Sequence, residues 1–165
     1  MAHIEENLLA CKCRGRWDRC LNLGCGSKSL GNLDGIDIKD FGQRYICDID
    51  NEEWPIPDNT YGGIHAWNIL EHIRNKIHVL NEAYRVLLPG GEIEIVVPDI
   101  VKKMELAVAD PTHVSFWVEG TFTQYFCGTR PGGSDYGIKK WELVESRHYN
   151  EVNDNLLLVR MKKPL

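Results

Sequence analysis

Several features are missing from this chain, and each absence excludes a class of protein. No apolar run approaches the roughly 20 residues that a membrane helix needs, so we expect no membrane association. The net charge of -5 lacks the basic footprint that a duplex nucleic acid attracts, which disfavours a nucleic-acid partner. The 165 residues suffice for one domain with a real core and are too few for two, so we expect a single domain over residues 1–165.

The six cysteines come without a recognisable secretion signal. We therefore expect reduced thiols and a cytoplasmic location. Cys11, Cys13 and Cys20 lie close together in the sequence, but their spacing is not a standard zinc spacing and no Cys-x-x-Cys pair follows. The sequence therefore predicts no metal site, and a structural zinc on these three cysteines is the alternative that stays open.

Short apolar segments alternate with turn-rich segments through most of the chain. We expect strands at residues 20–24, 35–38, 44–47, 63–67 and 93–97. Apolar residues at steps of three and four predict a helix between the last two of these strands, namely Ile73, Ile77, Leu80, Tyr84 and Leu87. Asn75 is the expected N-cap, with a separate short turn at 70–73 before it, and Pro89-Gly-Gly91 is expected to stop the helix.

The last third of the chain adds a predicted helix over residues 100–109 and strands at 141–147 and 156–161. Strands that alternate with helices indicate a parallel sheet with crossover helices. The short connection between the last two strands makes them antiparallel neighbours. The predicted fold class is therefore α/β, with a mostly parallel sheet and an antiparallel C-terminal strand.

The first two crossovers are unusually short. Between Gly26 and Gly35 there is room for at most about two helical turns, and between Lys39 and Gln43 there is none. One flank of the sheet should therefore be thinly covered by its own chain. We expect residues 1–19, a second subunit in a homodimer, or both to cover it.

The segment Leu21-Asn-Leu-Gly-Cys-Gly-Ser-Lys28 is the most informative stretch of the sequence. A buried strand runs into two glycines, whose missing side chains let a ligand lie against the main chain. In open α/β sheets this position, after the first strand, is where nucleotide-like cofactors bind. The segment therefore indicates an adenosine-type ligand, although a tight turn without a ligand has the same pattern.

Five further segments follow the glycine loop, and their order along the chain is informative. They are Gly35-Ile-Asp37, Cys47-Asp-Ile-Asp50, Trp54-Pro-Ile-Pro-Asp-Asn-Thr-Tyr61, Asn68-Ile-Leu-Glu-His-Ile73 and Arg85-Val-Leu-Leu-Pro-Gly-Gly91. Together with Leu21–Gly26, they resemble the Rossmann-like, class I S-adenosylmethionine-dependent methyltransferases, especially small members with a Leu-Glu-His helix start. The resemblance covers residues from about 20 to about 120 and implies S-adenosylmethionine as the cofactor.

The resemblance implies roles for the first half of the cofactor site. Gly24 and Gly26, with Asn22 and Cys25 beside them, would approach the amino-acid half of the cofactor. Asp37 would accept hydrogen bonds from the two ribose hydroxyls, which suits an acceptor-only carboxylate. A loop aspartate that caps a turn is the alternative for Asp37.

The remaining cofactor contacts come from three other strand ends. Ile38 follows Asp37, and Asp48 would receive the adenine amino group while Ile49 packs on the ring. Asp50 competes with Asp48 for this role, because the register is uncertain by two residues. At the end of the fourth strand, the expected neighbours of the sulfonium or the methionine carboxylate are Trp67 and Asn68. Trp67 is equally well explained as a core residue.

A dinucleotide-binding enzyme is the main alternative for the glycine loop. Such a site requires a third glycine where this chain has Ser29. Its acidic residue also comes about 20 residues later, whereas Asp37 follows Gly24 by 13 residues. Both differences disfavour a nicotinamide cofactor.

The methyl acceptor must be bound by residues after the fifth strand, so we assign residues 110–140 to the substrate side. Asp110-Pro-Thr-His-Val-Ser-Phe-Trp117 resembles a segment found there in part of the family. His113 is the candidate general base for a hydroxyl nucleophile, because histidine titrates near neutral pH. A histidine that only fixes the loop, for example by bonding Asp110, is the alternative.

The sequence therefore predicts methyl transfer to a small-molecule or sugar-like acceptor, at oxygen. Two alternatives stay open at this point. One is a non-catalytic scaffold or subunit with the same fold. The other is a methyltransferase that acts on RNA or protein together with a partner.

Overall fold

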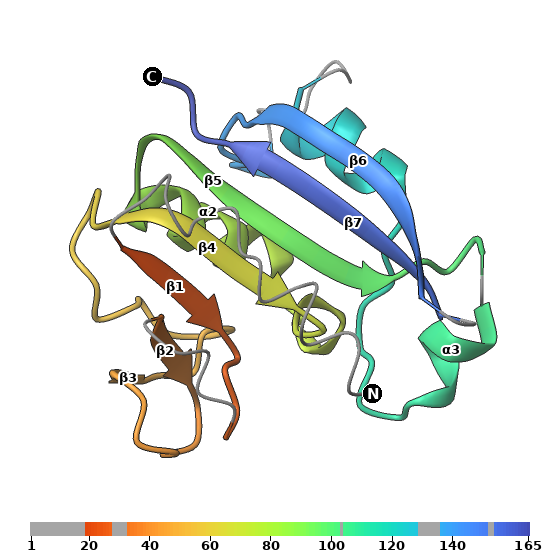
Figure 1. Ribbon diagram of the computed structural model, residues 1–165, viewed down its shortest axis with the longest axis horizontal. Coiled ribbons are helices and arrows are strands. Elements are labelled where there is room, and N and C mark those ends of the chain that lie inside the picture. The colour runs from red at the N-terminus through yellow and green to blue at the C-terminus, as the bar shows by residue number, and fades with distance from the viewer. Residues whose placement is uncertain (1–18, 28–32, 103, 129–135, 152–153) are drawn as a thin grey trace.

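A seven-stranded mixed sheet forms the centre of the protein (Figure 1). The computed structural model describes residues 19–27, 33–102, 104–128, 136–151 and 154–165. The strands are β1 (Cys20–Leu23), β2 (Asp34–Asp37), β3 (Tyr45–Ile46), β4 (Tyr61–Trp67), β5 (Leu87–Pro98), β6 (Glu142–Glu151) and β7 (Asp154–Lys162). Their order across the sheet is β3-β2-β1-β4-β5-β7-β6.

The strands from β1 to β5 pair in parallel, with β1 between β2 and β4. β7 then runs antiparallel between β5 and β6, pairing Ile95 with Val159 on one side and Ser146 with Val159 on the other. This confirms the predicted α/β class with an antiparallel C-terminal strand. It also places the carboxyl ends of β1, β2, β4 and β5 along one edge of the sheet (Figure 1).

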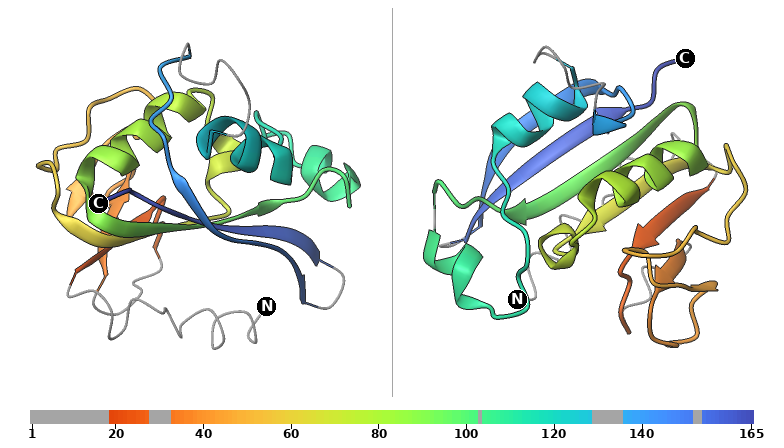
Figure 2. Two further views of the ribbon diagram at one scale, coloured as in Figure 1. Left: turned by 90° about the horizontal axis from the view of Figure 1, so that it is seen from above. Right: turned by 180° about the vertical axis from the view of Figure 1, so that it is seen from behind.

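In the described ranges, four helical segments lie between the strands. They are η1 (Leu70–His72), α2 (Lys76–Val86), α3 (Met104–Ala109) and η2 (Thr121–Phe126), the last with π-type hydrogen bonding. As predicted, Asn75 caps α2, since its side-chain oxygen accepts a hydrogen bond from the backbone N–H of His78 at 3.3 Å. Helices α2 and η2 cover the same face of the sheet, and within the described ranges no helix covers the opposite face (Figure 2).

The crossover from β2 to β3 contains no helix, as predicted. Instead the loop is closed by the Gln43 side chain, which accepts from the backbone N–H of Phe41 at 2.8 Å. The same amide donates to the carbonyl oxygens of Lys39 and Tyr45 at 2.8 and 3.0 Å. In the first crossover, residues 28–32 lie outside the described chain, as do residues 1–18 of the expected covering segment. That segment's role stays a prediction.

The starts of β5 and α3 and the end of β6, which reaches Glu151 where residue 147 was predicted, differ most from the sequence prediction. The residues Pro89-Gly-Gly91, expected only to stop the helix, already belong to strand β5, which begins at Leu87. Leu87 is extended, with φ -74° and ψ 142°, and Gly90 takes a left-handed φ of 78°. The chain thus enters the strand directly from the helix and bends inside it. Helix α3 is described from Met104, four residues after the predicted start at Ile100.

Helix α2 is tied to the segment before β4 by a buried ionic network. Glu82 accepts from the backbone N–H of Trp54 at 2.8 Å and from Arg85 Nη2 at 2.7 Å. Arg85 also donates to the carbonyl oxygens of Ile56 and Trp54. Burial alone would raise the pKa of Glu82, but the hydrogen bonds from Arg85 and Trp54 lower it overall. The network fixes α2 against the sheet. Because η1 comes just before α2, the network also positions η1 beside the carboxyl ends of the parallel strands.

The apolar core lies between the sheet and this helical face. Its largest fully buried side chains include Trp54, Tyr61, Trp117, Phe122 and Trp141. Trp117 stacks on Phe122 with ring centroids 5.0 Å apart, which seals residues 117–122 onto the core. None of the helices in the described ranges is long and apolar enough to cross a membrane.

Candidate functional site

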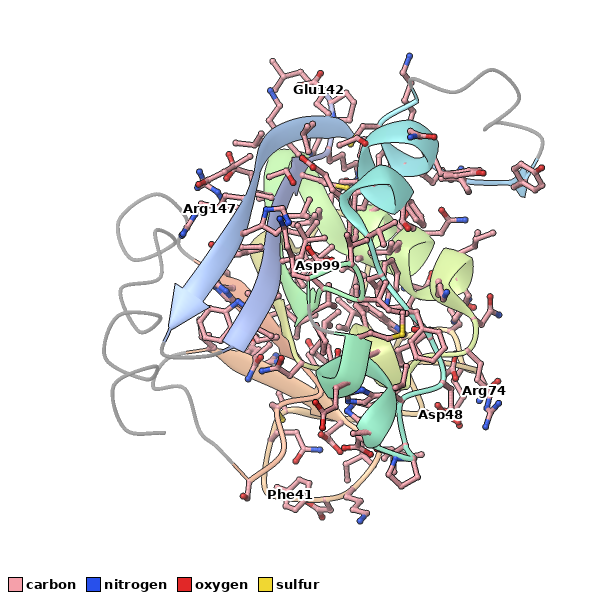
Figure 3. All side chains as sticks on the ribbon, turned by 90° about the vertical axis from the view of Figure 1, so that its right-hand side faces the viewer. Phe41, Asp48, Arg74, Asp99, Glu142 and Arg147 are labelled. Atoms are coloured by element: carbon pink, nitrogen blue, oxygen red, sulfur yellow. The ribbon has the colours of Figure 1, made fainter. Side chains whose placement is uncertain are left out.

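The candidate site lies along the edge where the parallel strands end. In open α/β sheets ligands bind in the crevice outside these carboxyl ends. Figure 3 shows Phe41 and Asp48 at this end of the molecule, with helix α3 beside them and Glu142 at the opposite end. The residues that the sequence assigns to the cofactor are distributed along this edge.

The loop after β1 is built for a close approach of its backbone. Gly24 and Gly26 have φ values of 59° and 56°, which favour glycine. A Cβ atom at Gly24 would collide with Ile69, so this glycine lets the loop pack on the chain that follows β4. At Gly26 nothing lies within 4 Å of the Cβ position, so this face of the loop is open to a ligand.

Asp37 ends β2 directly beside this loop. Its Oδ2 accepts the backbone N–H of Gly26 at 2.9 Å, and its Oδ1 accepts that of Lys39 at 3.0 Å. A carboxylate offers about four lone-pair positions. Two acceptor positions therefore remain for the ribose hydroxyls, while the same side chain holds the glycine loop. Ile38, the next residue, is 62% exposed.

Asp48 and Asp50 differ in what they already bind. Both carboxylate oxygens of Asp50 accept backbone N–H groups, from Arg74 at 3.0 Å and Asn75 at 2.7 Å. Asp50 therefore anchors the start of α2. Asp48 is half-buried, and among the described residues its carboxylate bonds within its own turn, to the N–H of Asp50 and the side chain of Asn51. This geometry favours Asp48 as the adenine ligand, which stays a prediction.

Three other residues predicted for the cofactor site are Ile49, Asn22 and Cys25, which are buried or partly buried beside it. Ile49 is buried in the core. Asn22 is 7% exposed on β1. Cys25 fills the space left by the missing side chain of Gly35, where a Cβ would lie 2.7 Å from its Sγ, and burial raises the pKa of its thiol. With Gly26 and Gln43, Asn22 lines a cavity of about 180 Å³.

Trp67 and Asn68 end β4 next to the glycine loop. The Trp67 indole N–H donates to Glu94 Oε1 at 3.1 Å, and the ring packs with Val96 and its neighbours. The side chain of Trp67 is thus engaged in packing on the sheet, in line with the core alternative. Asn68 is exposed and holds a left-handed φ of 50°. Strained backbone of this kind clusters at ligand sites.

The predicted acceptor segment packs directly on η1. The backbone N–H groups of Val114 and Ser115 donate to the carbonyl oxygen of Glu71 at 2.9 and 3.0 Å. Ser115 Oγ donates to the carbonyl oxygen of Leu70 at 2.7 Å, and the Trp117 indole donates to Ser115 Oγ at 3.0 Å. Residues 112–117 are thereby held at the end of β4, beside the glycine loop.

This packing brings His113 together with His72 and Glu71. The two imidazole rings lie edge to face with centroids 4.9 Å apart. His113 Nδ1 lies 2.8 Å from the carbonyl oxygen of Ala107, and His72 Nδ1 lies 3.2 Å from that of Thr112. A carbonyl oxygen only accepts, so each Nδ1 carries a hydrogen, and in the neutral form of each ring Nε2 keeps its lone pair. The Nε2 of His113 is 3.9 Å from Asp110 Oδ2, beyond hydrogen-bond distance.

Glu71 has a role in this group that was not predicted from the sequence. Its side chain is 3% exposed, and burial raises the pKa of its carboxyl. Helical spacing places it inside an apolar helix start, where an acidic residue is unexpected. That contrast in Leu70-Glu-His-Ile73 was the signal available in the sequence.

The family comparison agrees with this geometry. The profile of a family described as a methyltransferase domain matches residues 14–128, which is more than half of the chain. The chain therefore belongs to this methyltransferase family, and it is an S-adenosylmethionine-dependent enzyme of the class I, Rossmann-like type. No curated protein matched the sequence in a direct search.

Solved structures share the fold at low sequence identity. An S-adenosylmethionine-dependent methyltransferase of Archaeoglobus fulgidus is 15% identical, with a TM-score of 0.65 over 96% of this chain and 94% of that one. A Haloferax volcanii methyltransferase in complex with the Trm112 activator is 15% identical, with a TM-score of 0.65 over 99% and 93%. A Burkholderia thailandensis 1,6-didemethyltoxoflavin N1-methyltransferase with bound S-adenosylhomocysteine is 12% identical, with a TM-score of 0.64 over 96% and 77%.

The residues on the edge fit the cofactor of this family. Gly26 leaves open space where the main chain must approach a ligand, Asp37 keeps two acceptor positions, and Asp48 is free of the helix start that occupies Asp50. If the cofactor binds here, these groups would meet its amino-acid half, its ribose and its adenine, and these three assignments stay predictions.

Proposed function

We propose that this enzyme methylates an oxygen atom of a small-molecule or sugar-like acceptor. The observation that supports this is the position of His113, held beside the end of β4 with its Nδ1 bonded to the carbonyl oxygen of Ala107 at 2.8 Å. Its Nε2 is therefore a proton acceptor of fixed orientation. A hydroxyl acceptor has to lose a proton during methylation, whereas a neutral amine does not need to lose it before attack.

In the proposed reaction the bound cofactor supplies an electrophilic methyl group, whose bond to sulfur breaks as its bond to the acceptor oxygen forms. Gly24 and Gly26 would hold the amino-acid half, Asp37 the ribose and Asp48 the adenine. The chain mainly orients the acceptor oxygen toward the methyl carbon, since alignment supplies much of the rate in such reactions. The acceptor would be held between Asn68 and the segment around His113.

The test is a transfer assay with labelled cofactor and a panel of sugars, phenols, amines, peptides and RNA. We expect label on a hydroxyl compound, with the rate reduced by at least about tenfold in His113→Gln. His148→Gln is the matched control, because His148 lies on β6, pairs with Asp99 after β5, and should not affect the rate. Label confined to an amine, a peptide or RNA would overturn the proposal.

A partner on the edge of the sheet is a second element of the proposal. Strand β3 is one of the two edge strands of the sheet, with the exposed side chains of Ile38, Phe41 and Ile46 around it. The structural relative from Haloferax volcanii is bound to an activator. We propose that the chain forms a homodimer through this exposed region. We also propose that it works in the cytoplasm, where the described free cysteines would stay reduced, namely Cys20, Cys25, Cys47 and Cys127. Sedimentation of the purified chain, with Phe41→Ser as the dissociating variant, tests the homodimer.

A further inference from the structure

The geometry points to a divalent-cation site formed by Glu71, His72 and His113. One possible ligand atom from each of these three side chains lies within 4.8 Å of the others. The ligand atoms of one zinc ion lie no more than about 4.2 Å apart, so small side-chain rotations would bring all three onto a single ion. The prediction of no metal rested on the cysteines, and these three residues belong to a different part of the chain.

Both imidazoles are oriented as metal ligands usually are. A ligating histidine commonly donates its other ring N–H to a backbone carbonyl or a carboxylate, which fixes the ring and its tautomer. His113 does this with Ala107 and His72 with Thr112. The Thr112 hydroxyl, 3.1 Å from His72 Nδ1, is itself held by Asp110 at 2.6 Å. The supporting contacts of a metal site are therefore already present.

Glu71 supplies the independent observation that points to a ligand. Its carboxylate is buried, and Oε2 accepts no hydrogen bond from the part of the chain that the structure describes. A buried charged oxygen without a partner is costly, and buried charges are normally paired or bound to a metal. A cation between Glu71 and the two histidines would supply the missing partner.

The set of ligands defines the class of ion. Two imidazole nitrogens and one carboxylate oxygen suit first-row transition ions and zinc, whereas magnesium and calcium prefer oxygen ligands alone. Three protein ligands leave at least one position open, as in catalytic zinc sites. The open position would lie near the candidate acceptor region, because η1 begins two residues after Asn68.

The use of this cation in catalysis rests on the proposed oxygen methylation. The ion would take the acceptor hydroxyl oxygen as a further ligand and lower its pKa, as metal ions do for bound water. The hydroxyl proton would then pass to solvent water, and the oxygen would keep the electron pair for the new bond to carbon. His113 would bind the ion in this arrangement, so the general-base role proposed for its Nε2 applies to the metal-free chain and the ion activates the hydroxyl when it is bound.

The binding test uses the full chain without a histidine tag and cobalt(II) as the probe. Its visible spectrum distinguishes nitrogen and oxygen ligands from thiolates, which matters in a chain with six cysteines. We expect one cobalt per chain without thiolate bands. The variants Glu71→Gln and His113→Gln should each weaken binding by more than about tenfold, since even outer-shell changes cost about 10- to 100-fold. His148→Gln should bind like the wild type.

Three results would overturn the site: no cobalt binding, thiolate bands in place of nitrogen and oxygen ligation, or equal binding by wild type and Glu71→Gln. Circular dichroism confirms that each variant folds. If Glu71→Gln does not fold, the partly exposed His72→Gln takes its place in the comparison.

Failure of the metal site and failure of the proposed function give different results. Cobalt binding without methylation of any hydroxyl acceptor would keep the site and remove the oxygen-methylation proposal. Methylation of a hydroxyl acceptor that persists after chelation, in a chain that binds no cobalt, would keep the oxygen-methylation proposal and remove the metal site.

Discussion

The backbone N–H of Gly26 donates to Asp37 Oδ2 over 2.9 Å, so the carboxylate that ends β2 also holds the loop that follows β1. Asp37→Asn removes the charge and one acceptor oxygen. Hydrogen bonds to charged groups contribute about 1.5–3 kcal/mol, so we expect affinity for S-adenosylhomocysteine to fall by about ten- to hundredfold. Isothermal titration calorimetry measures this affinity.

Asp34→Asn is the matched control at the opposite end of the same strand. Asp34 accepts from Arg19 at 2.9 Å and from the Tyr61 hydroxyl at 2.7 Å, so its loss should lower the melting temperature. The affinity for S-adenosylhomocysteine should stay close to that of the wild type. Equal affinity losses in the two variants would show that Asp37 acts only through stability.

Gly26→Ala separates backbone strain from obstruction of the cofactor. A left-handed residue with a Cβ costs about 1–2 kcal/mol in stability. The added methyl also points into open space where we expect the cofactor, so affinity should fall at least about tenfold. Gly137→Ala has a comparable φ of 70° and equally open surroundings, and it should lose stability alone. Unchanged affinity in Gly26→Ala would place the cofactor elsewhere.

We expect Asn68 to act in the site through its side chain, although its left-handed backbone conformation favours glycine. Asn68→Gly removes the strain of a φ of 50°, so the free energy of unfolding should change by no more than about 1 kcal/mol. If the amide contacts the cofactor or the acceptor, binding or turnover should still fall. Asn59→Gly, with a φ of 53° in the turn before β4, is the control and should leave both unchanged. Full activity in Asn68→Gly would remove this residue from the site.

The stability that Glu82 contributes should disappear in acid. Hydrogen bonds from Arg85 and Trp54 hold its folded-state pKa below the ordinary value, against the effect of burial. Its contribution is therefore present above the unfolded pKa of about 4.3 and is lost as pH falls through the folded value. Glu82→Gln should lower the free energy of unfolding by about 1–3 kcal/mol near pH 7 and by much less near pH 3.

Denaturant unfolding at a series of pH values measures this difference. Glu53→Gln, an exposed carboxylate of the same segment, should show no comparable pH-dependent difference. A gap between wild type and Glu82→Gln that stays constant down to about pH 3 would contradict the ionic role of Glu82.

Much of the sheet could be predicted because its strands and breaks are local features. The β1 segment Cys20–Leu23, the Asn75 cap and the antiparallel pair at the end of the chain all follow from nearby residue types. The start of β5 could not be predicted in this way. It depends on Tyr61 pairing with Leu87, a contact between distant segments that extends a strand through a proline and two glycines.

The residues of the candidate site also fall into these two groups: some are visible in the local sequence, and others depend on contacts between distant segments. The glycines and Asp37 are visible in the sequence because each acts through its own backbone position or charge. The choice between Asp48 and Asp50 required the structure, since it depends on which of them meets the N–H groups before α2. Likewise, Glu71 and His113 are 42 residues apart (113 minus 71), and only the packing of residues 112–117 on η1 brings them together.

The insertion of β7 between β5 and β6 has a consequence for how the chain reaches its native state. β5 can pair with β7 only after residues 154–162 have been synthesised. Until then the backbone N–H and C=O groups on this edge of β5 stay unpaired, while the preceding residues emerge from the ribosome. Folding of this half of the sheet is then a late, long-range event, and nascent chains are most exposed to aggregation just before it.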